Sequence, residues 1–307
     1  MQLDTILKEY FFDLKIKNYS HKTIINYEAH LSKFKAILRP KVEIEDISLS
    51  DYKTFINKLL NDNLKPSYIN AILKSHKAFW NYILDEGLIQ KSPIEKIKLL
   101  KETKDVLIPF SDSEVKRMLN VWHTDKYLHF RNRAIIALLF DTGIRAHELI
   151  SITDDDISDN YIKIHGKGNK WRVVPLSLNL RYILAKYIRI RNNHFKSLRN
   201  RNSSERKLGN TLFLNKSGGS MKTIKQLENI FLQTCQMANV RNTVKQSPHQ
   251  ARHYFSIKNL QLGASIYTIS KMLGHTNLKT TQVYLQSITD YQLIQQALKT
   301  SPLDSLL

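Results

Sequence analysis

The sequence predicts a mainly α-helical protein of two domains, with a small β-hairpin in the second. Its 307 residues exceed the ~100–200 residues of an average domain. Over most of the chain, apolar side chains recur every three or four residues, which is the spacing of a helix with one buried face. Strand patterns are confined to residues 161–165 and 171–174, on either side of the turn Gly166–Lys170.

The first domain, residues 1–100, is predicted to be a bundle of four helices. Its second helical pattern ends before Pro40, because proline disfavours helix in the residue that precedes it. No strand pattern interrupts this part of the chain, which favours a small bundle. The helical patterns cover residues 3–14, 23–38, 51–60 and 68–84.

A linker is predicted over residues 101–110, where helical periodicity has been lost after a lysine-rich stretch. Ser111 and Glu114 then have the spacing of a capping box, in which each side chain binds an unpaired amide at a helix start. The second domain is therefore expected to span residues 111–307. Its helices are predicted over residues 131–140, 178–199, 223–238, 250–262, 265–273, 278–285 and 290–299.

The charge balance favours a polyanionic partner. There are 47 Lys and Arg residues against 27 Asp and Glu, a net charge of +20. Residues 1–104 hold 18 basic and 13 acidic residues, so 29 and 14 remain for residues 105–307 and give that part +15. Binding to nucleic acid is favoured because neutralising phosphates releases condensed counterions. The basic stretch 181–207 is either a phosphate contact or a solvated surface.

The remaining composition restricts the chemistry and the compartment. Cys235 is the single cysteine, so an intramolecular disulfide and a multi-cysteine metal site are both excluded, and its apolar setting predicts burial. The first residues lack a basic segment followed by an apolar core, so no secretory signal is expected. The apolar run 135–140 is too short to span a bilayer. We expect a cytoplasmic protein without a membrane segment.

Two arginines lie in segments of similar spacing. Arg145 and Glu148 are three residues apart, and His249 and Arg252 repeat that spacing after Pro248, a residue suited to the first turn of a helix. Arginine suits phosphate because its planar fork donates two parallel hydrogen bonds and stays charged. Each segment alone has an ordinary interpretation, such as a surface ion pair.

A third segment, Leu273–Tyr284, contains His275 and Tyr284 nine residues apart. One straight helix would put these two side chains on opposite sides, because nine residues make two and a half turns. Gly274 through Asn277 offers a break that would let both reach one phosphate. Taken alone, a tyrosine at helical spacing among apolar residues more often packs in a core.

The order and spacing of the three segments resemble the tyrosine recombinases, the Xer and phage integrase family that cuts and rejoins DNA through a phosphotyrosyl link. The resemblance implies a SAM-like core-binding domain followed by a mainly helical catalytic domain. It implies that Arg145, Arg252 and His275 stabilise the phosphate and that Tyr284 is the nucleophile. His249 would assist proton transfer, and Glu148 would orient its neighbours. The implied chemistry uses no metal and no cofactor.

The predicted hairpin adds basic candidates. In this family a hairpin lysine protonates the departing 5′ oxygen, and Lys167 matches it, with Lys170 as the nearest competitor. Lys170 and Arg172 are expected to contact the DNA backbone. His253 follows Arg252 directly, so we expect it to face away from the site and to be structural.

The resemblance also implies partners. Such proteins act as homo-tetramers on paired double-stranded DNA sites, through a Holliday junction. The amphipathic segment 290–299 would dock into a neighbouring subunit, with packing in its own subunit as the alternative. Dimer resolution and mobile-element integration both remain open, as does a second recombinase or regulator. The competing functions are a type IB topoisomerase and a non-catalytic DNA-binding protein.

Overall fold

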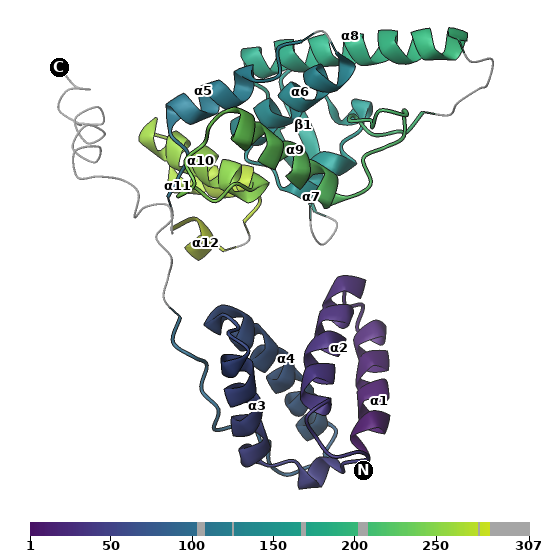
Figure 1. Ribbon diagram of the computed structural model, residues 1–307, viewed down its shortest axis with the longest axis vertical. Helices are drawn as coiled ribbons and strands as arrows, with labels where there is room; N and C mark the ends of the chain where they lie inside the picture. The colour runs from purple at the N-terminus through teal and green to yellow at the C-terminus, as the bar shows by residue number, and fades with distance from the viewer. Residues whose placement is uncertain (103–107, 125, 167–169, 202–207, 276, 283–307) are drawn as a thin grey trace, which may run out of the picture. The chain divides into compact units, whose positions relative to one another are not determined.

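The structure is a computed structural model and describes residues 1–102, 108–124, 126–166, 170–201, 208–275 and 277–282. The chain divides into two compact units, Met1–Val106 and Leu107–Leu307. Figure 1 shows that helices build both units and that the strands belong to the second. The predicted mainly helical fold with a small antiparallel sheet is confirmed.

Side-chain caps begin two of the helices in the first unit. Ser20 accepts a hydrogen bond from the Thr23 amide at one start, and Ser48 and Asp51 form a capping box at another. A proline opens the last helix, where its missing N–H costs nothing. The helices are α1 (Leu3–Ile16), α2 (His21–Lys35), α3 (Leu49–Asn61) and α4 (Pro66–Asp85).

A chain of buried hydrogen bonds links α2, α3 and α4. The Trp80 indole donates to the Tyr52 hydroxyl at 2.6 Å, and this hydroxyl lies 2.9 Å from His76 Nδ1. His76 Nε2 lies 3.1 Å from the carbonyl oxygen of His30, which can only accept, so Nε2 carries the proton. His76 Nδ1 must then accept from Tyr52, and neutral His76 has both ring nitrogens satisfied.

The second unit is built around α6 (Tyr127–Thr142), which is buried along most of its length. α6 packs against α8, α10 and α5, as Figure 1 shows. The helices predicted over residues 131–140, 178–199, 223–238, 250–262 and 265–273 are present, and the capping box of Ser111 and Glu114 starts α5. The other helices are α5 (Asp112–Asn120), α7 (Ala146–Ser151), α8 (Leu178–Arg201), α9 (Ile224–Met237), α10 (Pro248–Gln261), α11 (Ile266–Leu273) and α12 (Lys279–Gln282).

Strands β1 (Tyr161–His165) and β2 (Trp171–Pro175) pair antiparallel, with His165 opposite Trp171 at the turn end. The alternation of the strands buries Ile162, Ile164 and Val174 in the core of the unit. The residues that alternate with these, such as Lys163 and Val173, therefore lie on the opposite, exposed face of the hairpin.

The segment that opens the second unit is bound to α10. The Gln250 amide donates to the carbonyl oxygen of Ile108 at 2.6 Å, although the Gln250 residue is only 5% exposed. Asp112 accepts from Tyr254 and Lys258, at 2.9 and 2.5 Å. The start of the unit and α10 therefore form one packed element.

Several predictions fall outside the described residues. These are part of the linker 101–110, the turn residue Lys167, the nucleophile Tyr284 and the C-terminal helix 290–299. Within the part of the chain that is described, no helix is both long and apolar enough to cross a bilayer. Cys235 is buried as predicted, and burial raises the pKa of its thiol to about 12.

Candidate active site

The site begins where α6 ends. Gly143 adopts the left-handed conformation, with φ of +60°, and terminates the helix. A Cβ at this position would lie 2.6 Å from Cδ1 of Phe255 on α10. Glycine therefore serves two purposes here, the turn and the close approach of α10.

Arg145 follows as the residue immediately before α7. Its backbone N–H donates to Glu148 Oε2 at 2.8 Å, and its Nη1 donates to Glu148 Oε1 at 3.0 Å. The spacing of three residues thus brings the two together through a helix cap. The Arg145 side chain remains 33% exposed, enough to meet a ligand.

Glu148 is the buried anion of the site. Its side chain has no exposed surface and binds a second guanidinium, that of Arg172. Arg172 Nη1 and Nη2 donate to Glu148 Oε1 and Oε2, each at 2.8 Å, and Nε donates to the carbonyl oxygen of Met272 at the same distance. Burial by itself raises the pKa of Glu148, but the hydrogen bonds from Arg172 and Arg145 outweigh it and lower the pKa to about 2.

The guanidinium of Arg172 is bound within the protein, and its side chain is only 12% exposed. The DNA contact expected of Arg172 stays a prediction. The alternation of β2 turns Arg172 toward α7, between the exposed residues Trp171 and Val173. That pattern was visible in the sequence and could have placed Arg172 on the inner face. Lys170 is exposed, and its carbonyl oxygen accepts from the Gly166 amide at 2.8 Å.

Arg252 lies deep in the unit, with 1% of its surface exposed. Its Nη1 donates to the carbonyl oxygen of Gly143 at 2.7 Å, and its Nη2 donates to that of Leu273 at 2.7 Å. Nη2 also lies 2.9 Å from His275 Nε2. Arg252 lies on α10, within one of the three sequence segments. From there it binds the end of α6, beside the Arg145 segment, and the end of α11, where the His275 segment begins.

The contact with Arg252 fixes the tautomer of His275. A guanidinium can only donate, so Nε2 accepts and the proton sits on Nδ1, which lies 2.8 Å from the Thr281 hydroxyl. Burial, followed by the charges of Arg252 and Arg145, lowers the pKa of His275 to about 4. His275 is therefore neutral near pH 7.

The helix is interrupted between Leu273 and Lys279, as the sequence predicts. Gly274 ends α11 in the left-handed conformation, with φ of +66°. A Cβ on Gly274 would lie 2.9 Å from Cδ of Arg172, so this glycine also leaves room for the arginine that binds Glu148.

His249 lies in the first turn of α10, and burial followed by the nearby charge of Arg252 lowers its pKa. The expectation that His253 faces away from the site is wrong. His249 and His253 are four positions apart on α10, so they lie on one face of the helix. Their ring centroids are 4.4 Å apart. Burial, followed by the charge of His249, lowers the pKa of His253 to about 4.

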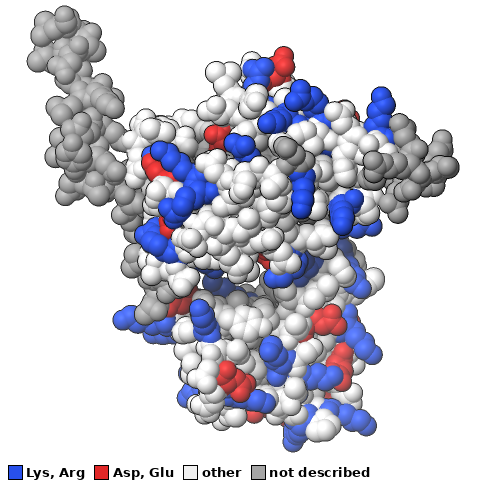
Figure 2. All heavy atoms as spheres, turned by 45° about the horizontal axis from the view of Figure 1, so that its top comes forward, with Lys and Arg blue, Asp and Glu red and all other residues white. Residues whose placement is uncertain are grey.

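The structure thus groups Arg145 and Arg172 around Glu148, and Arg252 with His275. Both groups bind the end of α11, through the carbonyl oxygens of Met272 and Leu273. Among the described residues, no cluster of His, Cys, Asp and Glu could hold a metal ion. On the face seen in Figure 2, lysine and arginine side chains are scattered, with fewer acidic ones among them. A network of paired guanidinium groups near neutral imidazoles can hold a phosphate and stabilise added negative charge.

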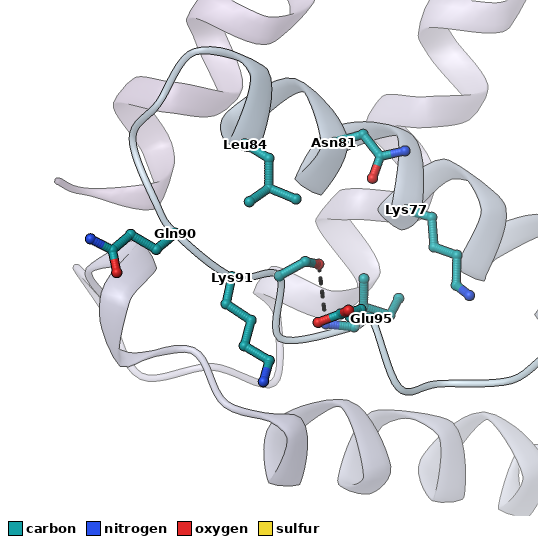
Figure 3. Close-up of a pocket in the computed structure, with 8 residues that line it drawn as sticks. Lys77, Asn81, Leu84, Gln90, Lys91 and Glu95 are labelled. Carbon is teal, nitrogen blue, oxygen red and sulfur yellow. Dashed lines mark hydrogen bonds between the residues drawn. The ribbon is translucent and has the colours of Figure 1, made fainter.

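A hollow in the first unit offers no comparable chemistry. It measures about 340 Å³ and lies beside the end of α4 (Figure 3). Its charged side chains are those of Lys77, Lys91 and Glu95, and Lys77 donates to the carbonyl oxygen of Ile97 at 2.7 Å. The candidate active site therefore lies in the second unit.

Comparison with known families assigns this arrangement. The model of the phage integrase family matches residues 108–290, and that of the phage integrase N-terminal SAM-like domain matches residues 7–87. The chain belongs to the phage integrase family. Within this family it is an Xer-like tyrosine recombinase, as two similar proteins indicate.

The tyrosine recombinase XerD of Staphylococcus haemolyticus is 31% identical, over 92% of this chain and 94% of that protein. The tyrosine recombinase XerC of Bacillus subtilis is 29% identical, over 87% of this chain and 86% of that protein. Among solved structures, a lambda integrase dimer bound to a COC′ core site matches with a TM-score of 0.75 and 17% identity, over 92% of this chain and 95% of that one. The last similarity supports the fold of an integrase.

Proposed function

We propose that this protein is a site-specific DNA recombinase that cuts and rejoins strands through a 3′-phosphotyrosyl intermediate. The observation that carries the proposal is the contact network of Arg252. This residue binds Gly143, two residues before Arg145, and also Leu273 and His275. Three segments far apart in the sequence therefore meet around one guanidinium, as a single phosphate site requires.

In the proposed reaction, the Tyr284 oxygen attacks phosphorus in line and forms a new P–O bond while the bond to the 5′ oxygen breaks. The phenol proton passes toward His249, and Lys167 gives a proton to the departing oxygen. Arg145, Arg252 and His275 stabilise the charge on the remaining phosphate oxygens. The ester keeps the energy of the broken bond, so a second 5′-hydroxyl can reverse the step without ATP.

Glu148 keeps Arg145 oriented in this scheme through a carboxylate that stays ionised at neutral pH. The two guanidinium groups on Glu148 leave a net positive charge for the phosphate. Lys170 is proposed to contact the DNA backbone beside the site. The scheme assigns no step to a metal or a cofactor.

The proposed assembly is a homo-tetramer on two double-stranded sites, with the first unit as the core DNA-binding domain and segment 290–299 docked into a neighbouring subunit. A lambda integrase tetramer bound to a Holliday junction, which is 17% identical and matches 90% of this chain with a TM-score of 0.71, is consistent with the proposed tetramer. The biological role is dimer resolution or mobile-element movement in the cytoplasm. Removing residues 290–307 should prevent pairing of sites but leave folding intact, and unchanged pairing would rule out the docking.

The deciding experiment is covalent capture. DNA bound by the protein in cells would be recovered and prepared as a nicked duplex, on which the protein should form a covalent adduct that Tyr284→Phe cannot form. An adduct formed by that variant would refute the assignment of the nucleophile. Relaxation of supercoils without site preference would favour a topoisomerase, and failure of the unaltered protein to form an adduct would favour a non-catalytic DNA-binding protein.

A further inference from the structure

Thr281 is a buried residue at the candidate active site. It belongs to α12 and has 0% of its surface exposed, whereas the neighbouring Thr280 of the same helix is exposed. Its hydroxyl lies 2.8 Å from Nδ1 of His275. Buried hydroxyls need a hydrogen-bond partner, and the imidazole supplies one here. A side chain outside the proposed catalytic set therefore contacts one of its members.

The hydrogen bond between Thr281 and His275 has a defined direction. Arg252 Nη2, which can only donate, lies 2.9 Å from Nε2 of the same imidazole. Nε2 therefore has to be the unprotonated nitrogen, so Nδ1 carries the proton and the Thr281 hydroxyl accepts it. Burial lowers the pKa of His275 to about 4, so the ring holds only that one proton near neutral pH.

The two contacts together select one orientation of the imidazole ring. A half turn about the Cβ–Cγ bond would exchange Nδ1 with Cδ2 and Nε2 with Cε1. Carbon would then face both Arg252 and Thr281, and the guanidinium and the buried hydroxyl would each lose a hydrogen-bond partner. Such losses are unfavourable in a site removed from water. The Thr281 hydroxyl therefore opposes the turn from one side of the ring, and Arg252 opposes it from the other.

Packing of α12 against α11 is the ordinary alternative for Thr281. The two helices are in contact, and a β-branched side chain suits such a contact. Valine has nearly the same shape as threonine, however, and would fill the space without a polar group to satisfy. A buried hydroxyl is therefore favoured over a methyl group only through its hydrogen bond, which is made to His275.

We propose that Thr281 is a positioning residue of the candidate active site, whose hydroxyl holds the His275 imidazole in the orientation that keeps Nε2 against Arg252. The inference rests on the proposed function, in which Arg252 and His275 together stabilise the charge on the phosphate. Thr281 contacts neither the DNA nor the reacting atoms in this scheme and acts through His275.

Nitrogen NMR of the histidine side chains measures this orientation without DNA. Protonated and unprotonated ring nitrogens resonate far apart, and the His275 signals are assigned by their loss in His275→Gln. We expect a protonated Nδ1 and an unprotonated Nε2 in the full chain. Thr280→Val, the same change at the exposed neighbour, is the matched control and should leave these signals in place, as should Thr281→Ser, which keeps the hydroxyl.

Thr281→Val should replace this single state of His275 by a mixture of the two tautomers, because the ring is then held from one side only. The variant removes the hydroxyl and keeps the shape of the side chain, so α12 should remain packed. His275 signals that are the same in Thr281→Val and in the unaltered protein would overturn the proposal.

The rate of adduct formation on the nicked duplex supplies a second measurement. At saturating DNA, Thr281→Val should form the adduct about ten-fold more slowly, as expected when a catalytic group is misplaced. Its Kd for the duplex should change by less than about two-fold, since Thr281 makes no contact with DNA. Thr281→Ser should restore the rate, and Thr280→Val should not alter it. An unaltered rate in Thr281→Val, or an equal loss of rate and affinity, would contradict the positioning role.

The two measurements separate this inference from the proposed function. If Thr281→Val alters the His275 tautomer but the unaltered protein forms no adduct on its cognate DNA, Thr281 still orients His275 and the recombinase function is refuted. If the unaltered protein forms the adduct and Thr281→Val leaves the tautomer unchanged, the recombinase function stands and the role of Thr281 is refuted.

Discussion

Arg172 and Glu148 form a bidentate pair, with two parallel hydrogen bonds of 2.8 Å from the guanidinium to the carboxylate. The same carboxylate binds the backbone and the side chain of Arg145. A residue on β2 thus determines the position of an arginine in front of α7. The pair links the hairpin to the phosphate-binding arginine that the family resemblance implies.

Glu148→Gln should impair both the fold and the reaction. Glutamine has one acceptor oxygen and no charge, so it cannot satisfy both guanidinium groups. Breaking a buried pair in this way costs about 3 kcal/mol, and we expect the free energy of unfolding in urea to fall by that order. Adduct formation on the nicked duplex should fall at least ten-fold at a temperature where the variant stays folded. An unchanged rate would separate Glu148 from the reaction.

Arg172→Lys tests the geometry of the pair at constant charge. Lysine offers a point charge and cannot bind both Glu148 oxygens together with the carbonyl oxygen of Met272. Adduct formation should therefore slow by about ten-fold, with a loss of roughly 1–2 kcal/mol in unfolding free energy. If lysine restores the rate of the unaltered protein, charge alone is sufficient and the bidentate geometry is dispensable.

Gly143→Ala should destabilise the second unit through a steric clash. The added Cβ would lie 2.6 Å from the Phe255 ring, in addition to the strain of φ near +60°. Gly263→Ala is the matched control, because φ is also positive there and nothing lies within 4 Å of the new Cβ. We expect the control to cost about 1 kcal/mol and Gly143→Ala at least 2 kcal/mol more, measured by urea unfolding. Equal losses would show that Phe255 moves aside.

The first unit should lose stability in acid. Burial lowers the pKa of His76 from 6.5 to about 4, so between these values the unfolded chain binds the proton and the folded unit does not. The contribution of neutral His76 is complete above pH 6.5 and is lost progressively as the pH falls to about 4. The loss is on the order of 3 kcal/mol, from about 1.36 kcal/mol per pKa unit.

Urea unfolding followed by the fluorescence of Trp80, the tryptophan of the first unit, measures this loss. His76→Gln should flatten the dependence on pH between 6.5 and 4, because glutamine does not titrate. A slope as steep as that of the unaltered protein would assign the effect to other groups, such as His30, whose pKa burial also lowers.

Most of the fold could be predicted from the sequence because helices are encoded by local signals. Apolar periodicity located α4 and α8, and the capping box at Ser111 located the start of α5. The contact of Arg252 with the carbonyl oxygen of Gly143 could not be predicted, since it depends on how α10 packs against the end of α6. Nothing local to either residue encodes that approach, apart from the glycine that permits it.

The site residues divide in the same way. Motif spacing selected Arg145, His249, Arg252 and His275, whose roles stay predictions. It did not anticipate the pairing of Arg172 with Glu148 or the position of His253 beside His249. Strand alternation would have turned Arg172 inward, and the four-residue spacing would have placed His253 beside His249. Lys167, Tyr284 and helix 290–299 stay predictions of sequence and family.

The hydrogen bond from Gln250 to Ile108 has a practical consequence for anyone dividing this protein. A fragment that begins at Leu107 keeps the carbonyl acceptor of a nearly buried amide on the helix that bears His249 and Arg252. A fragment that begins at Ser111 lacks that acceptor and residues 108–110. The shorter fragment should melt at a lower temperature. Moving the start by four residues therefore decides whether the isolated unit has the stability that it has in the full chain.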